Sequence, residues 1–164
     1  MVRRGHRDVL RIGWAIVERS APTLAPTGGR YRARPMGDAT RVLLVRHGQS
    51  EWNAERRWQG QADPPLTDLG RRQAREAARA LGAVDAIWAS DLQRATATAL
   101  IIAEHLGIGP VVVEPAFRER DAGAYSGLTR DEIEARFPGY LTRRRPPPGW
   151  EPDDSLLDRA VGAL

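Results

Sequence analysis

The sequence predicts an α/β fold with a mostly parallel sheet. Three short apolar runs, near residues 41–45, 85–90 and 111–113, are separated by two amphipathic segments of helical length. Strands that alternate with helices at these lengths are typical of βαβ units, in which helices cover a largely parallel sheet. Such sheets carry their chemistry at the carboxyl ends of the strands, so the residues that follow each run are the candidates for a site.

The first apolar run leads directly into a histidine. Residues Arg41 to Val45 are rich in β-branched side chains, as expected of a buried parallel strand, and Arg46-His47-Gly48 follows at once. The strand fixes the backbone at His47, and Gly48 lets the chain turn sharply. Because a histidine after a strand is more often an ordinary surface residue, this tripeptide alone does not identify a site.

Two helices are predicted between the strands. The first is opened by Thr67 as N-cap and closed by Gly82, and the second runs over residues 91–106 and ends before Gly107. Both have apolar side chains at i, i+3, i+4 and i+7 spacing along one face. This spacing is typical of helices that lie against a sheet.

Two further helices are predicted after the third strand. A short one covers residues 129–137, and a proline-rich loop at residues 146–148 separates it from a last helix. We expect the last helix to open at Asp154 or Ser155 and to be still running at Leu164. No internal repeat is visible, so a length of 164 residues fits one domain.

The positive charge of the chain is confined to its first part. Residues 1–37 hold eight arginines against two acidic residues, a balance of +6, and residues 38–164 hold seventeen against nineteen, a balance of −2. Every basic residue is arginine, which fits an arginine-rich proteome better than a nucleic-acid surface. We therefore expect residues 1–37 to be a basic, disordered extension, residues 38–164 to be the folded domain, and nucleic acid not to be a partner.

Composition excludes several kinds of site. The chain has no cysteine for a disulfide or a thiolate metal site, and its three histidines, His6, His47 and His105, are few for a multi-histidine metal centre. The apolar run at residues 12–17 is shorter than the core of a signal peptide, which has about 7 to 15 residues, and far shorter than a membrane span. We expect a cytoplasmic protein that uses neither a metal nor a cofactor and does not bind a membrane.

A second arginine is predicted at the same edge of the sheet. Ser90 ends the second strand, and Arg94 lies one turn into the next helix, so its guanidinium can point toward His47. Two arginines that converge with a helix N-terminus suit a dianion such as phosphate, because each charge-assisted hydrogen bond contributes about 1.5 to 3 kcal/mol. Cationic neighbours also favour a neutral imidazole, which can attack phosphorus. By itself, Arg94 would be an ordinary solvated charge on a helix.

An acidic residue follows the third strand. Glu119 precedes Gly123 and Gly127 and can supply the proton for a leaving alcohol if it is partly buried beside the other groups. The alternative is a surface ion pair, for which Arg118 and Arg120 are both available. The residues themselves leave both possibilities open.

In this order and spacing, the three elements resemble the histidine phosphatase superfamily, in its phosphoglycerate-mutase-like branch. The resemblance runs from about residue 41 to the end of the chain and rests on the Arg-His-Gly tripeptide, on the Ser-x-Leu-x-Arg-Ala pattern around Arg94 and on Glu119 before the glycine pair. It implies a three-layer α/β/α sandwich. It also implies a small phosphorylated metabolite as partner and a reaction that needs no metal.

The resemblance implies a role for each of seven residues. His47 would be the nucleophile that becomes a phosphohistidine, and Glu119 would be the proton donor. Residues that match the phosphate-binding positions of the family are Arg46, Asn53, Gln59, Gly60 and Arg94.

One element of the family has no counterpart in this sequence. The family completes its phosphate pocket with a second histidine on a later strand, which lies in the interior of the sheet, whereas only His6 and His105 remain here. We therefore expect a sandwich that is incomplete at its C-terminus, with unpaired strand edges, an exposed apolar face and low stability. Since losing one such group costs about 10² to 10⁴ in rate, we expect little or no activity from the 164 residues.

The leading functional prediction is hydrolysis of a phosphomonoester through a phosphohistidine at His47. The alternative within the family is a phosphoglycerate mutase, but mutases usually show Glu-Arg-His-Tyr-Gly, and here Glu119 and Arg120 are followed by Asp-Ala-Gly. A non-catalytic remnant that only binds phosphate is the third possibility. The sequence names neither the substrate nor the oligomeric state.

Overall fold

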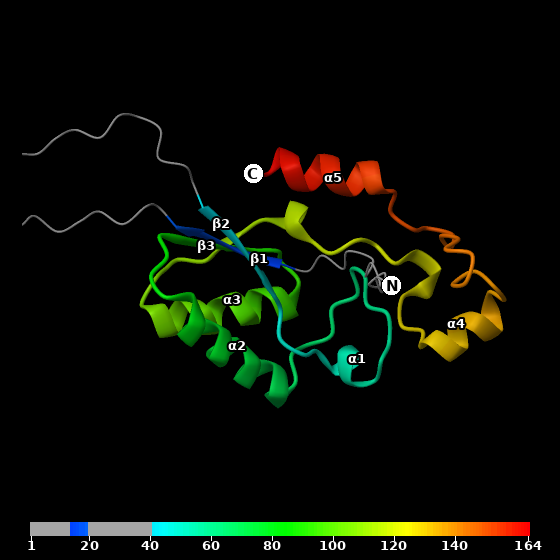
Figure 1. Ribbon diagram of the computed structural model, residues 1–164, viewed down its shortest axis with the longest axis horizontal. Coiled ribbons are helices and arrows are strands. Elements are labelled where there is room, and N and C mark those ends of the chain that lie inside the picture. The colour runs from blue at the N-terminus through cyan, green and yellow to red at the C-terminus, as the bar shows by residue number, and fades with distance from the viewer. Residues whose placement is uncertain (1–13, 20–40) are drawn as a thin grey trace, which may run out of the picture.

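The described part of the chain is an α/β protein, as predicted. The computed structural model describes residues 14–19 and 41–164. Its elements in chain order are β1 (Trp14–Arg19), β2 (Arg41–Arg46), α1 (Glu51–Ala54), α2 (Asp68–Leu81), β3 (Ala86–Ala89), α3 (Gln93–Leu106), β4 (Val112–Val113), the 3-10 helices η1 (Pro115–Phe117) and η2 (Gly123–Tyr125), α4 (Arg130–Arg136) and α5 (Asp153–Gly162) (Figure 1).

The four strands form one sheet in the order β2-β1-β3-β4. β1 is antiparallel to both of its neighbours, and β3 is parallel to β4. Because β2 and β3 both oppose β1, the strands β2, β3 and β4 all run in the same direction. These are the three strands that the sequence predicts, and their carboxyl ends share one edge of the sheet.

The strand β1 corrects the prediction that residues 1–37 are a disordered extension. Residues 14–19 of that segment pair with all six residues of β2 on one side and with β3 on the other. An apolar run of this length is far too short for a membrane helix, but it is long enough for a strand that has a hydrogen-bonding partner on each side. The rest of the extension, residues 1–13 and 20–37, lies outside the described residues.

The helices α2 and α3 pack against each other and cover one face of the sheet (Figure 1). Leu43 and Val45 of β2 point toward this layer and pack on its core. The buried residues of that core are Ala78, Val84, Ile87, Ala89, Ala99, Ile102 and Ala103. The predicted apolar face of α3 is therefore buried against the sheet, and α2 packs on α3 and contributes Ala78 to the same core.

The opposite face of the sheet is largely open in the described part of the chain. Val42 and Leu44 alternate with the partly buried residues of β2 and are 44% and 54% exposed, and Val112 on β4, in register with Trp88, is 37% exposed. The helix α5 lies on this side of the sheet in Figure 1 and packs on η1. It ends at Gly162, so it does not run to Leu164 as predicted.

Most helix boundaries follow the capping residues that the sequence shows. The side chain of Thr67 caps α2, Gly82 follows its last turn, and α3 ends at Gly107 in the left-handed conformation. The two longest helices have 14 residues each, and within residues 14–19 and 41–164 no helix has the length and apolarity needed to cross a bilayer. The short elements α1, η1 and η2 are too brief to show a periodic pattern.

A second, smaller core lies around α4. Ala122, Tyr125 and Ile133 are buried at its centre. Partly buried apolar side chains surround them: Trp58, Leu128, Phe137, Tyr140, Leu141 and Trp150. This cluster joins the segment after α1 to the segment after η1, two parts of the chain that are far apart in the sequence.

Replacing Ile16 by proline should strongly destabilise the chain. Ile16 lies between Leu44 and Trp88 in an interior strand, where proline removes a ladder hydrogen bond and is poorly tolerated. We expect a loss of about 3 kcal/mol or more in the free energy of unfolding, measured by chemical denaturation. Ile16→Val keeps the backbone N–H and is the matched control, and equal effects of the two substitutions would contradict the placement of β1.

Candidate functional site

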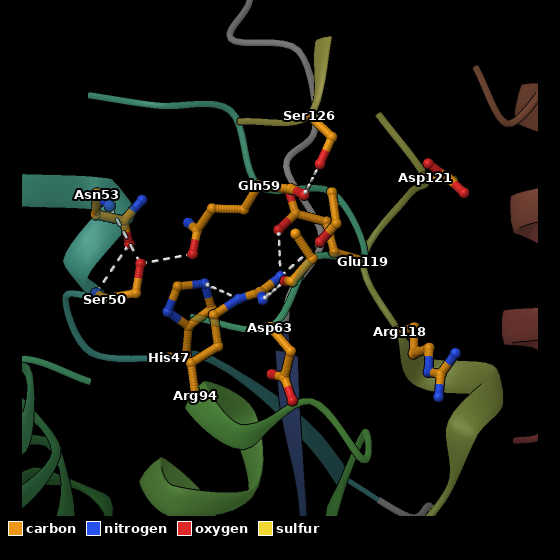
Figure 2. Close-up of polar contacts among 12 residues, drawn as sticks. His47, Ser50, Asn53, Gln59, Asp63, Arg94, Arg118, Glu119, Asp121 and Ser126 are labelled. Carbon is orange, nitrogen blue, oxygen red and sulfur yellow. Dashed lines mark hydrogen bonds and ion pairs between the residues drawn. The ribbon is translucent and has the colours of Figure 1, made fainter. Parts of the chain in front are cut away.

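Five of the seven residues that the sequence singles out line one pocket at the carboxyl edge of the sheet. They are Arg46, Asn53, Gln59, Gly60 and Glu119. The other two adjoin it, since Arg94 contacts Gly60 and Glu119, and His47 contacts Arg94. Figure 2 shows the side chain of Arg94 between those of His47 and Glu119. Residues from β2, α1, α3 and the segment after η1 therefore meet at this pocket.

The two ring nitrogens of His47 have different partners. Arg94 donates a hydrogen bond from Nε to His47 Nε2 over 3.3 Å, and His47 Nδ1 lies 2.6 Å from the carbonyl oxygen of Gly48. An arginine N–H can only donate, so we assign Nε2 as the unprotonated nitrogen and Nδ1–H as the donor to Gly48. The imidazole therefore keeps a lone pair on Nε2.

Burial keeps the imidazole of His47 neutral. It lowers the pKa of His47 from the ordinary 6.5 to about 4. The hydrogen bond to the carbonyl of Gly48 opposes this shift, and the positive charges of Arg94 and Arg46 add to it. The sequence predicts the same direction from the arginines alone, but loss of solvation is the larger cause. At pH 7 His47 is in the nucleophilic form.

Arg94 is fully buried, and its guanidinium donates to acceptors on several sides. Its terminal nitrogens donate to the carbonyl oxygens of Ala62 at 2.6 Å and Gly60 at 2.7 Å, and burial lowers its pKa. Gly60 has a φ of +55°, and a Cβ at this position would lie 2.4 Å from the backbone nitrogen of Ala122. Glycine is therefore needed where the chain turns its carbonyl toward Arg94.

The carboxylate of Glu119 faces the site, not its neighbours in the sequence. It lies 3.2 Å from a terminal nitrogen of Arg94 and is only 15% exposed. Arg118 instead pairs with Asp91, and Arg120 pairs with Asp153. Figure 2 shows Arg118 pointing away from Glu119. Of the two possibilities that the sequence leaves open, the structure therefore has the carboxylate in the pocket.

Ser50 orients the side-chain amides of Asn53 and Gln59. Its hydroxyl donates to Gln59 Oε1 over 2.5 Å, and its backbone N–H donates to Asn53 Oδ1 over 3.2 Å. Because both amide oxygens are engaged in this way, Nδ2 of Asn53 and Nε2 of Gln59 are the donor ends of two side chains that line the pocket. Ser50 is fully buried, and sequence reasoning missed it. The available signal is a serine N-cap three residues before Asn53.

The loop that carries His47 is held from two sides. The backbone N–H of Gly48 donates to the hydroxyl of Thr98, which in turn donates to the carbonyl of Arg94. On the other side the loop touches the first turn of α2, where a Cβ on Gly48 would lie 2.2 Å from the carbonyl oxygen of Gly70. Thr98 follows Arg94 by four residues, so helical spacing could have placed both on one face.

The N-terminus of α3 does not contribute to the dianion site that the sequence predicts. Asp63 accepts a hydrogen bond from the backbone N–H of Gln93 over 2.6 Å, so a carboxylate already occupies this helix end. The prediction that two arginines converge with a helix N-terminus is therefore wrong in its third component. The donors around the pocket are side chains.

Within the described ranges, 14–19 and 41–164, no group of three or more histidine and acidic residues is arranged to hold a metal ion. The polar groups that line the pocket are mainly hydrogen-bond donors from arginine and amide side chains, with Glu119 as the acidic one. Such a set suits an anion with several acceptor oxygens.

Comparison with known proteins gives a family match over most of the chain. A model of the histidine phosphatase superfamily, branch 1, matches residues 42–164. The uncharacterized phosphatase PhoE of Bacillus subtilis strain 168 is 39% identical over 127 residues, which are 76% of this chain and 63% of that protein. A 2,3-bisphosphoglycerate-dependent phosphoglycerate mutase of Methylobacterium sp. strain 4-46 is 42% identical over 135 residues, or 75% and 64% of the two chains. The chain thus spans less than two thirds of the length of these relatives.

Solved structures give the same result for the fold. The mycobacterial glucosyl-3-phosphoglycerate phosphatase in complex with VO3 has a TM-score of 0.65 and 35% identity, and the match covers 71% of this chain and 61% of that one. Bacillus stearothermophilus YhfR has a TM-score of 0.64 and 35% identity, with coverage of 72% and 62%. The fold is therefore shared with both of these solved structures.

The lowered pKa of His47 predicts a loss of stability in mild acid. The imidazole of His47 binds a proton less well in the folded state than in the unfolded state. The free energy of unfolding is therefore undiminished by this group above pH 6.5 and decreases as the pH falls from 6.5 toward 4. Between pH 8 and pH 5 we expect a loss of about 2 kcal/mol from this group, measured by urea denaturation. The loss should be absent in His47→Gln and retained in His105→Gln. An unchanged pH dependence in His47→Gln would contradict the assignment.

Ser50→Ala should weaken phosphate binding more than it weakens the fold. It removes the hydroxyl that holds Gln59 Oε1 and keeps the backbone hydrogen bond to Asn53, so the amide of Gln59 is free to rotate. We expect about a tenfold lower affinity for inorganic phosphate, measured by calorimetry. Loss of the helix cap should cost about 1 kcal/mol in stability. Thr129→Ala removes the equivalent cap of α4 and should leave phosphate affinity unchanged. Ser50→Thr, which keeps a hydroxyl at this position, should bind phosphate as the unchanged chain does. Equal phosphate affinities of Ser50→Ala and Thr129→Ala would refute the orienting role.

Proposed function

The chain belongs to the histidine phosphatase superfamily, and on that premise we propose that it carries the nucleophilic centre of a phosphomonoesterase that works through a phosphohistidine at His47. The observation that supports this most directly is the state of the ring. Its Nε2 is the unprotonated nitrogen, and it lies 3.3 Å from Nε of Arg94. A neutral imidazole beside cationic donors is suited to attack a bound phosphate.

In the first step, His47 Nε2 attacks phosphorus, and the bond from phosphorus to the ester oxygen breaks. Glu119, which enters this step in its protonated carboxylic acid form, gives its proton to the leaving alcohol and becomes a carboxylate, and the phosphoryl group stays on Nε2. We propose that Arg46, Arg94 and Asn53 donate hydrogen bonds to the phosphoryl oxygens, together with the amide of Gln59 and the turn at Gly60. Such donors act most strongly where negative charge grows in the transition state.

In the second step, a water molecule attacks the phosphorus of the phosphohistidine. The carboxylate of Glu119, left without its proton by the first step, accepts a proton from this water. The bond from phosphorus to Nε2 breaks, inorganic phosphate leaves, and His47 returns to its neutral form. Both steps use the same small set of side chains, and Arg94 contacts both the nucleophile and the proton donor.

Hydrolysis is favoured over mutase-type transfer, although the relatives named above include both. The segment Asp-Ala-Gly after Glu119 and Arg120 departs from the pattern that mutases usually show. A small phosphorylated metabolite is the proposed substrate class, as for the mycobacterial relative named after glucosyl-3-phosphoglycerate. A cytoplasmic location stays a prediction.

We also propose that turnover by these 164 residues is slow. The other histidine in the described part, His105, is exposed near the end of α3, and eleven residues of helix, about 16 Å, separate it from Arg94. It therefore does not reach the pocket. If phosphate binds but no phosphohistidine forms, the non-catalytic binder is the better description.

The test is to incubate the chain with p-nitrophenyl phosphate and to measure acid-labile phosphohistidine by mass spectrometry. We expect up to one phosphoryl group per chain at His47, with slow later turnover. Arg94→Lys should lower the rate of phosphorylation by about 10² or more, because the forked donor geometry is lost. His105→Asn is the matched control and should behave as the unchanged chain. Phosphorylation that persists in His47→Asn would overturn the proposal.

A further inference from the structure

The pocket continues from Glu119 along a wall of indole rings. We propose that this wall, formed by Trp58, Trp150 and the intervening Arg120, binds the leaving alcohol and selects phosphate esters of uncharged alcohols that carry a flat or ring-shaped group. The proposal deepens the proposed function and rests on it, because it takes the phosphate to lie beside His47. Nothing in the sequence pattern singles out these three residues.

Both tryptophans line the pocket together with Glu119. Each is only partly buried, and their ring centroids are 6.1 Å apart with the planes tilted by 57°. A partly exposed indole face in a pocket presents a rigid apolar surface on which an aryl ring or the apolar face of a sugar can stack. Since Glu119 is the proposed proton donor to the leaving oxygen, this surface lies on the leaving-group side.

The wall is built into the second core and needs little ordering when a ligand binds. Tyr125, which is 2% exposed, contacts Trp58 at 5.4 Å and Trp150 at 6.2 Å between ring centroids, in both cases edge to face. The backbone of Trp58 is bonded on both sides, to Leu128 and Gly127. Rings that are held in place before binding lose little entropy on contact with a ligand.

The arginines at this end of the pocket already pair with acceptors within the protein through most of their nitrogens. The guanidinium of Arg120 lies over the ring of Trp150 at 5.3 Å. Its terminal nitrogens bond the carbonyl of Glu151 and the carboxylate of Asp153, and its Nε is buried without a hydrogen-bond partner. Arg57 pairs with Glu55 and Glu132 and donates to the carbonyl of Gly127. A second anionic group on the leaving alcohol would compete with these acceptors for the two arginines, whereas a neutral ring leaves the pairs intact.

The experiment measures equilibrium binding to the full chain carrying His47→Asn, which prevents phosphoryl transfer. The probes are 1-naphthyl phosphate, inorganic phosphate and 3-phosphoglycerate, and the affinity of the chain for each is measured by calorimetry. We expect 1-naphthyl phosphate to bind about tenfold more tightly than inorganic phosphate. We expect 3-phosphoglycerate to bind no more tightly than inorganic phosphate. Trp150→Leu should remove the naphthyl preference without changing phosphate affinity, and Trp150→Phe should keep it. The matched control is Trp88→Leu, since Trp88 packs on Phe117 and is not part of the pocket lining.

The outcomes separate this inference from the function on which it rests. If phosphate binds but the naphthyl ester gains nothing, or if the gain survives in Trp150→Leu, the aromatic subsite is overturned and the phosphate site stands. If 3-phosphoglycerate binds most tightly, the wall serves an anionic leaving group and the selectivity is wrong. If none of the three ligands binds to a chain that unfolds cooperatively, the proposed function falls together with the inference.

Discussion

A guanidinium that water does not reach lies at the centre of this structure. Burying such a charge costs several kcal/mol unless its N–H groups are paired, and Arg94 meets this requirement with the carbonyls of Gly60 and Ala62, the carboxylate of Glu119 and Nε2 of His47. Each of these contacts also determines a functional feature. The carbonyls fix the path of one pocket loop, the carboxylate is held within reach of the site, and the ring is kept in one tautomer. The same hydrogen bonds therefore stabilise the buried charge of Arg94 and keep Nε2 of His47 unprotonated.

The parts of the fold that the sequence predicts are those specified by local patterns. The β-branched run after residue 41 and the helices bounded by Thr67 and by glycines follow from periodicity and capping, which depend on neighbours in the chain. The site could be predicted because strands that run in one direction end at one edge. That single rule brings Arg46 and His47 from one strand close to Arg94, which follows another.

The parts that the sequence does not predict depend on partners far along the chain. The first four residues of β1 belong to an ordinary short apolar run, and only the pairing of the strand with β2 and β3 gives it a place in the sheet. Asp63 occupies a helix end that would otherwise face the anion, and Ser50 reaches Gln59 across a turn. Polar contacts of this kind show no periodicity, because one hydrogen bond needs only one well-placed atom at each end.

The contact between the loop of His47 and the first turn of α2 links mutational tolerance at two distant points of the sequence. A methyl group on Gly70 would lie 2.1 Å from the carbonyl oxygen of Gln49, next to the glycine that follows His47. A saturation scan scored by phosphoryl transfer would therefore rank Gly70 with the reactive residues, although it touches no ligand. Substitution at this helix turn is therefore limited by the loop that carries the nucleophile.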